Sequence, residues 1–250
     1  MEQFSRTELL IGKEGLQRLH NASVTIIGLG AVGSYCAEAL ARAGVGHFRC
    51  VDFDVIRPSN INRHIWAFHS TLGIPKAEMA RRRILDINPQ SSAEVMTMFA
   101  DIKTMPEILQ GTQNIIVDAV DSLNPKAQVL ETCWRSGATV ISSMGAATRT
   151  DPLALRTGDL MDTTVCPLAK RLRKMLKDRG VGRGIHCVYS IQQQDTYALS
   201  AAATQREEGE LDRGRLRRKL GSLSTLTGIF GLTLAHVTLK HLLSDLSCLK

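Results

Sequence analysis

The residues with the clearest capacity for chemistry begin at a glycine-rich turn. Gly28, Gly30 and Gly33 have G-x-G-x-x-G spacing directly after a β-branched run, and such glycines let backbone amides approach phosphates closely. Asp52 lies 19 residues after Gly33, where a carboxylate can accept hydrogen bonds from a ribose hydroxyl. This spacing predicts a nucleotide site to which all four residues contribute.

The polar residues that follow Asp52 discriminate between nucleotides. Asn60, Arg63 and Lys76 come next, and Asp121 closes a later apolar run. An NAD-dependent oxidoreductase has no need of two cations and a second carboxylate. In nucleotidyl transfer, by contrast, cations stabilise phosphate charge and a carboxylate holds Mg²⁺. The sequence contains no G-x-x-x-x-G-K-[ST] motif of P-loop ATPases. The set therefore favours ATP and Mg²⁺ as ligands, with a redox enzyme or a non-catalytic nucleotide-binding module as alternatives.

The elements that would position these residues alternate between strand and helix. We expect strands over residues 23–27, 48–51, 93–99, 114–117 and 139–143, and helices over 5–20, from the glycine turn to about 43, over 76–87, and from an Asn124 cap onward. This alternation predicts an α/β fold with a Rossmann-like, doubly wound, mostly parallel sheet, helices on both faces and an added C-terminal region. Open sheets of this kind bind ligands at the carboxyl ends of their strands, where the polar residues fall.

The length of the chain and the absence of a long polar linker predict a single domain, 1–250, with its ATP-binding core over 23–145. The later part is less regular. We expect strands at 153–156 and 186–190, a basic helix that opens at Cys166-Pro167, and a polar, mobile loop at 191–222.

The last expected helix, 223–243, is apolar and uncharged as far as Leu239. Glycine, serine and threonine dilute it, which favours a buried or dimer-interface helix over a membrane span. The N-terminus has no apolar signal run. We therefore expect a cytoplasmic protein without stable membrane insertion, and membrane association through 223–243 is the alternative.

The net charge and the spacing of the cysteines limit which kinds of partner and metal site are plausible. The net charge is +7, and cations cluster at 170–184 and 213–219. These clusters are either solvated surface or a footprint for a nucleic-acid backbone. The six cysteines include no C-x-x-C pair, which argues against a thiolate zinc site.

Five short runs carry a resemblance to a known family. GLGAVG, VDFD, SNINR, GIPK and DAVDS occur in this order within residues 24–122. They resemble the adenylating enzymes related to ubiquitin-activating enzyme, which include the bacterial adenylyltransferases of molybdopterin and thiamin biosynthesis. The resemblance implies that Asp52 binds the ribose and that Asn60 lies near the phosphates. It also implies that Arg63 and Lys76 contact the phosphates and that Asp121 lies near the Mg²⁺.

The same resemblance assigns a role to Arg6. In that family an N-terminal arginine from the partner subunit reaches the ATP, and Arg6 in FSRTELL is similar in position. On residue type alone Arg6 would be an ordinary surface charge. The resemblance thus implies a homodimer in which Arg6 acts in the site of the partner subunit.

Longer runs resemble one branch of the family, the tRNA threonylcarbamoyladenosine dehydratases: FSRTELLIGKEGL, INRHIWAFHSTLGIPKAE, ILDINP, ISSMGA and VCPLAKRLRKMLKDRG. This implies ATP-dependent dehydration of N6-threonylcarbamoyladenosine in tRNA, through an acyl-adenylate and ring closure, with tRNA contacts by the basic clusters. The alternative is activation of the C-terminus of a small ubiquitin-like sulfur carrier, with a sulfur-relay protein as partner. The absent C-x-x-C pairs count against it. For Cys166 we favour a helix-start residue over a thioester nucleophile.

Overall fold

The computed structural model describes residues 2–111, 115–194 and 220–244. Its described strands form a seven-stranded sheet in the order β3-β2-β1-β4-β5-β7-β6. The strands are β1 (Ser23–Ile27), β2 (His47–Val51), β3 (Ser92–Met96), β4 (Ile115–Asp118), β5 (Val140–Ser143), β6 (Leu155–Asp159) and β7 (His186–Ser190). Every neighbouring pair is parallel except β6–β7, which is antiparallel. The predicted Rossmann-like, mostly parallel sheet is confirmed.

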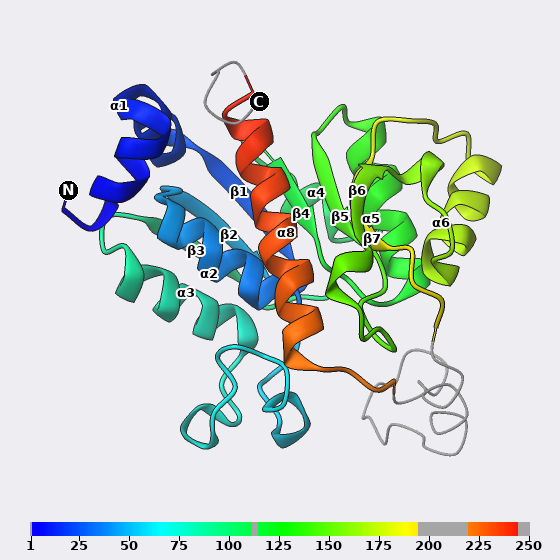
Figure 1. The fold of residues 1–250 in the computed structure, drawn as a ribbon, viewed down its shortest axis with the longest axis horizontal. Helices are drawn as coiled ribbons and strands as arrows, with labels where there is room; N and C mark the ends of the chain where they lie inside the picture. The colour runs from blue at the N-terminus through cyan, green and yellow to red at the C-terminus, as the bar shows by residue number, and fades with distance from the viewer. Residues whose placement is uncertain (1, 112–114, 195–219, 245–250) are drawn as a thin grey trace.

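Helices cover both faces of this sheet (Figure 1). They are α1 (Ser5–Asn21), α2 (Gly33–Ala43), α3 (Lys76–Ile87), α4 (Met105–Ile108), α5 (Leu123–Arg135), α6 (Pro167–Asp178) and α8 (Ser224–Leu242). Side chains alternate across a strand. Val24 and Ile26 of β1 therefore pack toward α2, α3 and α8, whereas Ile27 packs toward α4, α5 and α6.

Helix α8 lies across α2 and the middle of the sheet (Figure 1). Its glycines permit this close approach, because a Cβ on Gly231 would fall 2.4 Å from the carbonyl oxygen of Val32. Phe230 and Leu234 of α8 itself are fully buried. The expected buried position of this helix is therefore confirmed. Within the ranges that the structure describes, no helix combines the length and apolarity needed to cross a membrane.

Several expected element boundaries were wrong. Strand β3 ends at Met96 rather than residue 99, because the amide of Met98 turns back to the carbonyl of Met96. Helix α5 begins at Leu123, so its cap is Ser122 and not Asn124. The short helix α4 was not expected. The strand expected at 153–156 lies at Leu155–Asp159, where it pairs with β7.

The first helix also differs from its expected form. Helix α1 is interrupted at Gly12, whose φ of 75° is not helical. The half before this kink turns Leu9 and Leu10 to solvent, at 88% and 69% exposure, whereas Leu19 in the second half is buried. Of the polar loop expected at 191–222, residues 191–194 and 220–222 are described and contain no helix or strand. The basic cluster 213–219 lies outside the described residues.

Candidate nucleotide site at the carboxyl edge of the sheet

The glycine turn joins β1 to α2, and its three glycines have different tasks. A Cβ on Gly28 (φ +88°) would lie 2.9 Å from the backbone of Ala119, and a Cβ on Gly33 would lie 1.9 Å from the carbonyl oxygen of Gly28. Packing inside the protein therefore requires both. A Cβ on Gly30 would meet nothing within 4 Å. Gly30 is thus the position where the turn is open to a ligand such as a phosphate.

Asp52 follows β2 and ties the glycine turn to the next loop. One carboxylate oxygen accepts a hydrogen bond from the amide of Leu29 (2.7 Å) and the other accepts one from the amide of Asp54 (2.8 Å). Burial raises the pKa of Asp52, and the charge of Lys76 and these two amides oppose the shift. Each oxygen keeps a second lone pair, so the carboxylate can still accept hydrogen bonds from hydroxyl groups of a ligand.

Lys76 is the first residue of α3 and is held by a carboxylate that sequence reasoning did not assign. Its Nζ lies 3.0 Å from Oδ2 of Asp54, and its backbone amide donates to the carbonyl of Asp54. The side chain of Lys76 is 9% exposed and that of Asp54 is 32% exposed. The ammonium thus stands at a helix N-terminus, beside the loop that Asp52 organises. The signal for Asp54 was the second acid of VDFD.

Asn60 and Arg63 lie on the loop between β2 and α3. The side-chain oxygen of Asn60 accepts from the amide of Arg57 (3.1 Å), which closes the short helical turn Pro58–Asn60. The guanidinium of Arg63 donates to the carbonyl of Ser59 (2.7 Å) and to the side chain of Asn62 (3.0 Å). In the described part of the chain no carboxylate pairs with Arg63, so its charge is available to an anion.

His64 is a residue of this site that sequence reasoning missed. Its Nε2 lies 2.7 Å from the carbonyl of Leu29 in the glycine turn, and its Nδ1 lies 3.1 Å from the amide of Trp66. The amide can only donate, so Nδ1 accepts and Nε2 carries the proton. Burial lowers the pKa of His64 to about 4, which keeps the ring neutral. Its position directly after Arg63 was the only available signal.

Asp121 lies in the turn that joins β4 to α5, and its carboxylate is exposed. This turn adjoins the glycine turn, because the amide of Ala119 donates to the carbonyl of Ile27 (2.8 Å). The described residues contain no cluster of three or more side chains able to hold a metal ion. An exposed carboxylate does fit Mg²⁺, which uses one or two carboxylates and takes its other ligands from phosphates and water.

The structure therefore brings Asp52, Asn60, Arg63, Lys76 and Asp121 to the carboxyl ends of the parallel strands. A model of the ThiF family matches residues 4–248 of this sequence. The chain belongs to the ThiF family.

Individual proteins also resemble the chain over almost its whole length. It is 34% identical to tRNA threonylcarbamoyladenosine dehydratase of Bacillus subtilis (strain 168), over 98% of this chain and 96% of the relative. It also superimposes on the crystal structure of Escherichia coli tRNA N6-threonylcarbamoyladenosine dehydratase in complex with ATP. That match has a TM-score of 0.86 at 30% identity and covers 98% of this chain and 95% of the other. By contrast, molybdopterin-synthase adenylyltransferase of Salmonella typhimurium matches at 32% identity over 60% of this chain and 59% of the relative.

Arg6 is the one predicted site residue of this ThiF-family chain that lies away from the others. It is exposed in the first turn of α1. Three residues before it, Gln3 donates to Asn88 just beyond the end of α3 (3.5 Å). Lys76 stands at the opposite end of this 12-residue helix, and a helix of that length is about 18 Å long. The two ends are visible in Figure 1.

Cys166 is the residue directly before α6 and is 2% exposed. The cysteines at positions 36, 50, 133 and 187 are buried as well, and all five described cysteines are free thiols. Cys166 therefore has the position expected of a helix-start residue. Cys248 lies outside the described residues.

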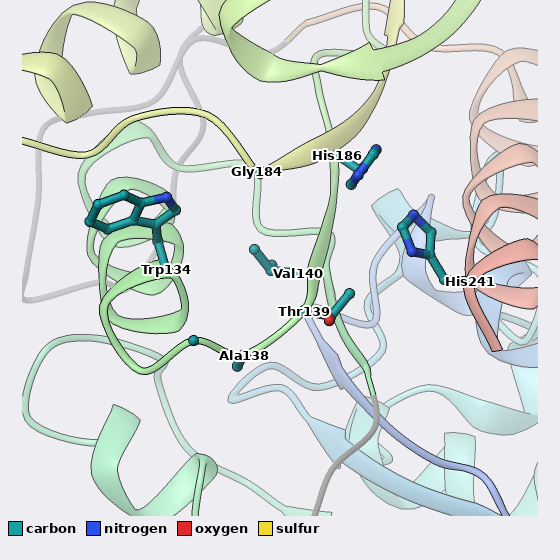
Figure 2. A pocket seen from close by; sticks show the side chains of 8 residues that line it. Trp134, Ala138, Thr139, Val140, Gly184, His186 and His241 are labelled. Atoms are coloured by element: carbon teal, nitrogen blue, oxygen red, sulfur yellow. The ribbon is translucent and has the colours of Figure 1, made fainter. Parts of the chain in front are cut away.

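A separate pocket lies at the opposite edge of the sheet (Figure 2). Its volume is about 320 Å³, and its lining includes Trp134, Thr139, His186 and His241. The two histidine rings meet edge to face, with centroids 4.5 Å apart. Because His186 begins β7 and Thr139 precedes β5, this pocket is at the amino ends of the strands. It is not part of the site around Asp52 and Asp121.

Proposed function

We propose that this protein uses ATP to dehydrate N6-threonylcarbamoyladenosine in tRNA to its cyclic form. The observation that carries the proposal is the near full-length similarity to relatives of that name, combined with the polar edge around Gly30 and Asp52. The relative of known structure was crystallised with ATP. The adenylyltransferase that acts in molybdopterin synthesis matches only part of this chain, so a sulfur-carrier substrate and a sulfur-relay partner are not favoured.

The chemistry requires a leaving group. A free carboxylate is a poor acyl donor because oxide leaves poorly, so the threonyl carboxylate attacks the α-phosphate of ATP and pyrophosphate departs. The resulting acyl-adenylate has AMP as leaving group. The carbamoyl group of the same side chain then attacks the activated carbonyl and loses a proton. AMP departs with the carboxylate oxygen and the ring closes, for a net loss of one water. The tethered nucleophile makes this second step effectively unimolecular.

The residues at the carboxyl ends of the strands have distinct roles in this scheme. Asp52 holds the ribose, because both of its oxygens are already oriented by backbone amides. Arg63 and Lys76 stabilise charge on the phosphates, and Asn60 shapes the loop that carries Arg63. The ammonium of Lys76 has three N–H donors, so it can bind a phosphate while it keeps its ion pair with Asp54.

Mg²⁺ would neutralise charge on the departing pyrophosphate, and Asp121 would be its protein ligand. The exposed carboxylate of Asp121 sits in the turn that packs against the glycine turn, where the phosphates would lie. Ser122 donates its hydroxyl proton to this carboxylate (3.2 Å) and so orients it. A carboxylate placed in this way suits a cation that is shared with the nucleotide.

A homodimer completes the site in this proposal. Lys76 begins α3, and Arg6 lies near the opposite end of that helix. Arg6 would therefore contact the ATP that is bound by a second copy of the chain. Leu9 and Leu10 support this, because they expose apolar surface on the same half-helix as Arg6. An exposed apolar patch of this kind is typical of a protein interface.

Within the described residues, helix α6 provides the basic surface that would bind tRNA. It buries Ala169, Leu172 and Leu176 and turns basic side chains outward. The exposed cations on this helix are Lys170, Arg171, Lys174 and Lys177. Such a surface attracts phosphates without reading sequence. Because its substrate is tRNA, we expect the protein to act in the cytoplasm.

One assay tests the proposal. The protein is incubated with ATP, Mg²⁺ and tRNA that carries threonylcarbamoyladenosine, and the nucleosides are analysed by mass. We expect the modified nucleoside to lose the mass of one water and AMP to form in equal amount. If AMP forms only when a small carrier protein replaces the tRNA, the proposed substrate is wrong.

A further inference from the structure

A fully buried ion pair lies directly beneath the turn that carries Asp121. The side chains of Asp118, at the end of β4, and Lys126, in α5, are both 0% exposed, and the Nζ of Lys126 lies 2.7 Å from Oδ2 of Asp118. The hydroxyl of Ser142 on β5 donates to the same oxygen (2.6 Å). None of these three residues has a role in the proposed reaction.

Stability alone does not account for this pair. Taking two charges out of water is costly, and apolar side chains of similar volume often stabilise a core equally well or better. A buried pair is therefore better explained by what it orients. Here both charged groups also form hydrogen bonds with the backbone of one residue, Val120.

Both backbone polar groups of Val120 are hydrogen-bonded to the ion pair. Its amide donates to Oδ1 of Asp118 (3.1 Å), and its carbonyl accepts from Nζ of Lys126 (2.9 Å). The preceding residue, Ala119, donates to Ile27 and leaves no room for a Cβ on Gly28. The pair thus fixes the turn 119–122 against the glycine turn, one residue before Asp121.

We infer that Lys126 is a positioning residue for adenylation, which acts through Asp118 and Val120 to hold the Asp121 carboxylate where a nucleotide-bound Mg²⁺ requires it. The inference rests on the proposed function, because it assigns the cation and the nucleotide to this edge. Lys126 itself does not touch ATP. Its predicted signature is a change in the Mg²⁺ requirement, which a residue that served only core stability would not alter.

The decisive variant removes both charges together. In Asp118→Asn/Lys126→Met, the asparagine keeps an acceptor for Val120 and the methionine fills the space of the lysine stem, but the carbonyl of Val120 loses its donor. We expect a thermal midpoint near that of the wild type. The Mg²⁺ concentration that half-saturates ATP binding should rise at least tenfold, and kcat for AMP formation should fall at least tenfold with KM for tRNA unchanged.

Two matched variants separate this role from a structural one. Ser142→Ala removes a bond to Asp118 but leaves the bond from Lys126 to Val120, so the Mg²⁺ requirement should not change. Lys103→Met, at an exposed lysine, should change neither quantity. An unaltered Mg²⁺ requirement in the double variant would overturn the inference, even if the thermal midpoint falls. An equal rise in Ser142→Ala and the double variant would overturn it as well.

A measurement on the wild type covers the case in which the double variant does not fold. Hydrogen exchange without nucleotide should show the amide of Val120 protected to the same degree as β4. If the amide of Val120 exchanges as rapidly as one in an open loop until Mg²⁺ and ATP are added, the turn is not held in place before the nucleotide binds, which would contradict the inference. If the wild type binds Mg²⁺ and ATP yet makes no cyclic nucleoside, the proposed substrate fails, and the Mg²⁺ titrations still decide the role of Lys126.

Discussion

Lys76 and Asp54 form an ion pair across the start of α3, with 3.0 Å between Nζ and Oδ2. The same two residues are joined by a backbone hydrogen bond from Lys76 to the carbonyl of Asp54 (2.9 Å). The pair holds the ammonium at the carboxyl edge of the sheet before any nucleotide arrives. A phosphate that binds there would share the ammonium with a carboxylate that is already in place, because the ammonium has three N–H donors.

Replacing Lys76 with alanine should abolish most of the activity while the fold survives. We expect ATP-dependent AMP formation to fall by about 10²–10³-fold, the usual effect of losing one group that stabilises developing charge. Asp54 is open enough to be hydrated once its partner is gone, so the thermal midpoint should shift little. Lys103→Ala is the surface control. Wild-type rates in Lys76→Ala would remove this lysine from the phosphate site.

Arg63→Ala should give a similar loss of activity for a different structural reason. The guanidinium is held by the carbonyl of Ser59 and the side chain of Asn62, and no described carboxylate neutralises it. We expect weaker ATP binding together with slower AMP formation, measured by calorimetry and by single-turnover kinetics. Arg82→Ala, which removes an exposed ion pair on α3, should leave both unchanged. Unimpaired ATP binding in Arg63→Ala would contradict the assignment.

His64 should make stability depend on pH. Burial lowers the pKa of the ring from 6.5 to about 4 in the folded protein, so the unfolded chain binds a proton first as pH falls. The stabilisation is present above pH 6.5 and is lost as pH falls from 6.5 to about 4. It amounts to about 3 kcal/mol.

Denaturant melts at several pH values test the role of His64 with two variants. His64→Gln keeps an N–H for the carbonyl of Leu29 but does not titrate, so it should flatten this part of the profile and retain ATP binding. His64→Ala should flatten the profile and weaken ATP binding, because the glycine turn loses its donor. Parallel pH profiles for wild type and His64→Gln would show that the ring does not titrate in this way.

Arg6 and Asp121 should complement each other in hybrid dimers. Each of Arg6→Ala and Asp121→Ala should be inactive alone, because every site in the dimer lacks one group. A hybrid contains one intact site, so an equal mixture after subunit exchange should recover about a quarter of wild-type activity. Tagged purification of the hybrid provides the control for exchange. An inactive hybrid would show that the two residues do not share a site across the interface.

Helix α6 should govern affinity for tRNA and not for ATP. Replacing Lys170, Lys174 and Lys177 with glutamine should weaken tRNA binding and reduce the steepness of its salt dependence, because fewer counterions are released. Filter binding at several salt concentrations measures both effects. ATP binding by the same variant is the control and should match that of the wild type, because α6 carries none of the proposed nucleotide ligands. An unchanged salt dependence would place the tRNA elsewhere.

Local patterns in the sequence were enough to predict the α/β alternation and the residues that meet at the carboxyl edge. Apolar runs mark the strands, the glycine spacing marks the turn after β1, and every parallel strand ends at the same edge. The positions of Asp52 and Lys76 were therefore predictable, because Asp52 directly follows a strand and Lys76 begins a helix, and Asp121 was predictable from the loop that follows the next strand of the site.

The groups that hold those residues in place were visible only in the folded protein. Lys126 reaches Asp118 and Val120 because α5 turns back over the end of β4, and His64 reaches Leu29 across 35 positions of sequence. The kink at Gly12, which exposes Leu9 and Leu10, likewise has no signature in the helical pattern. Such contacts depend on how separate elements pack against one another, and hydrophobic periodicity carries no information about that.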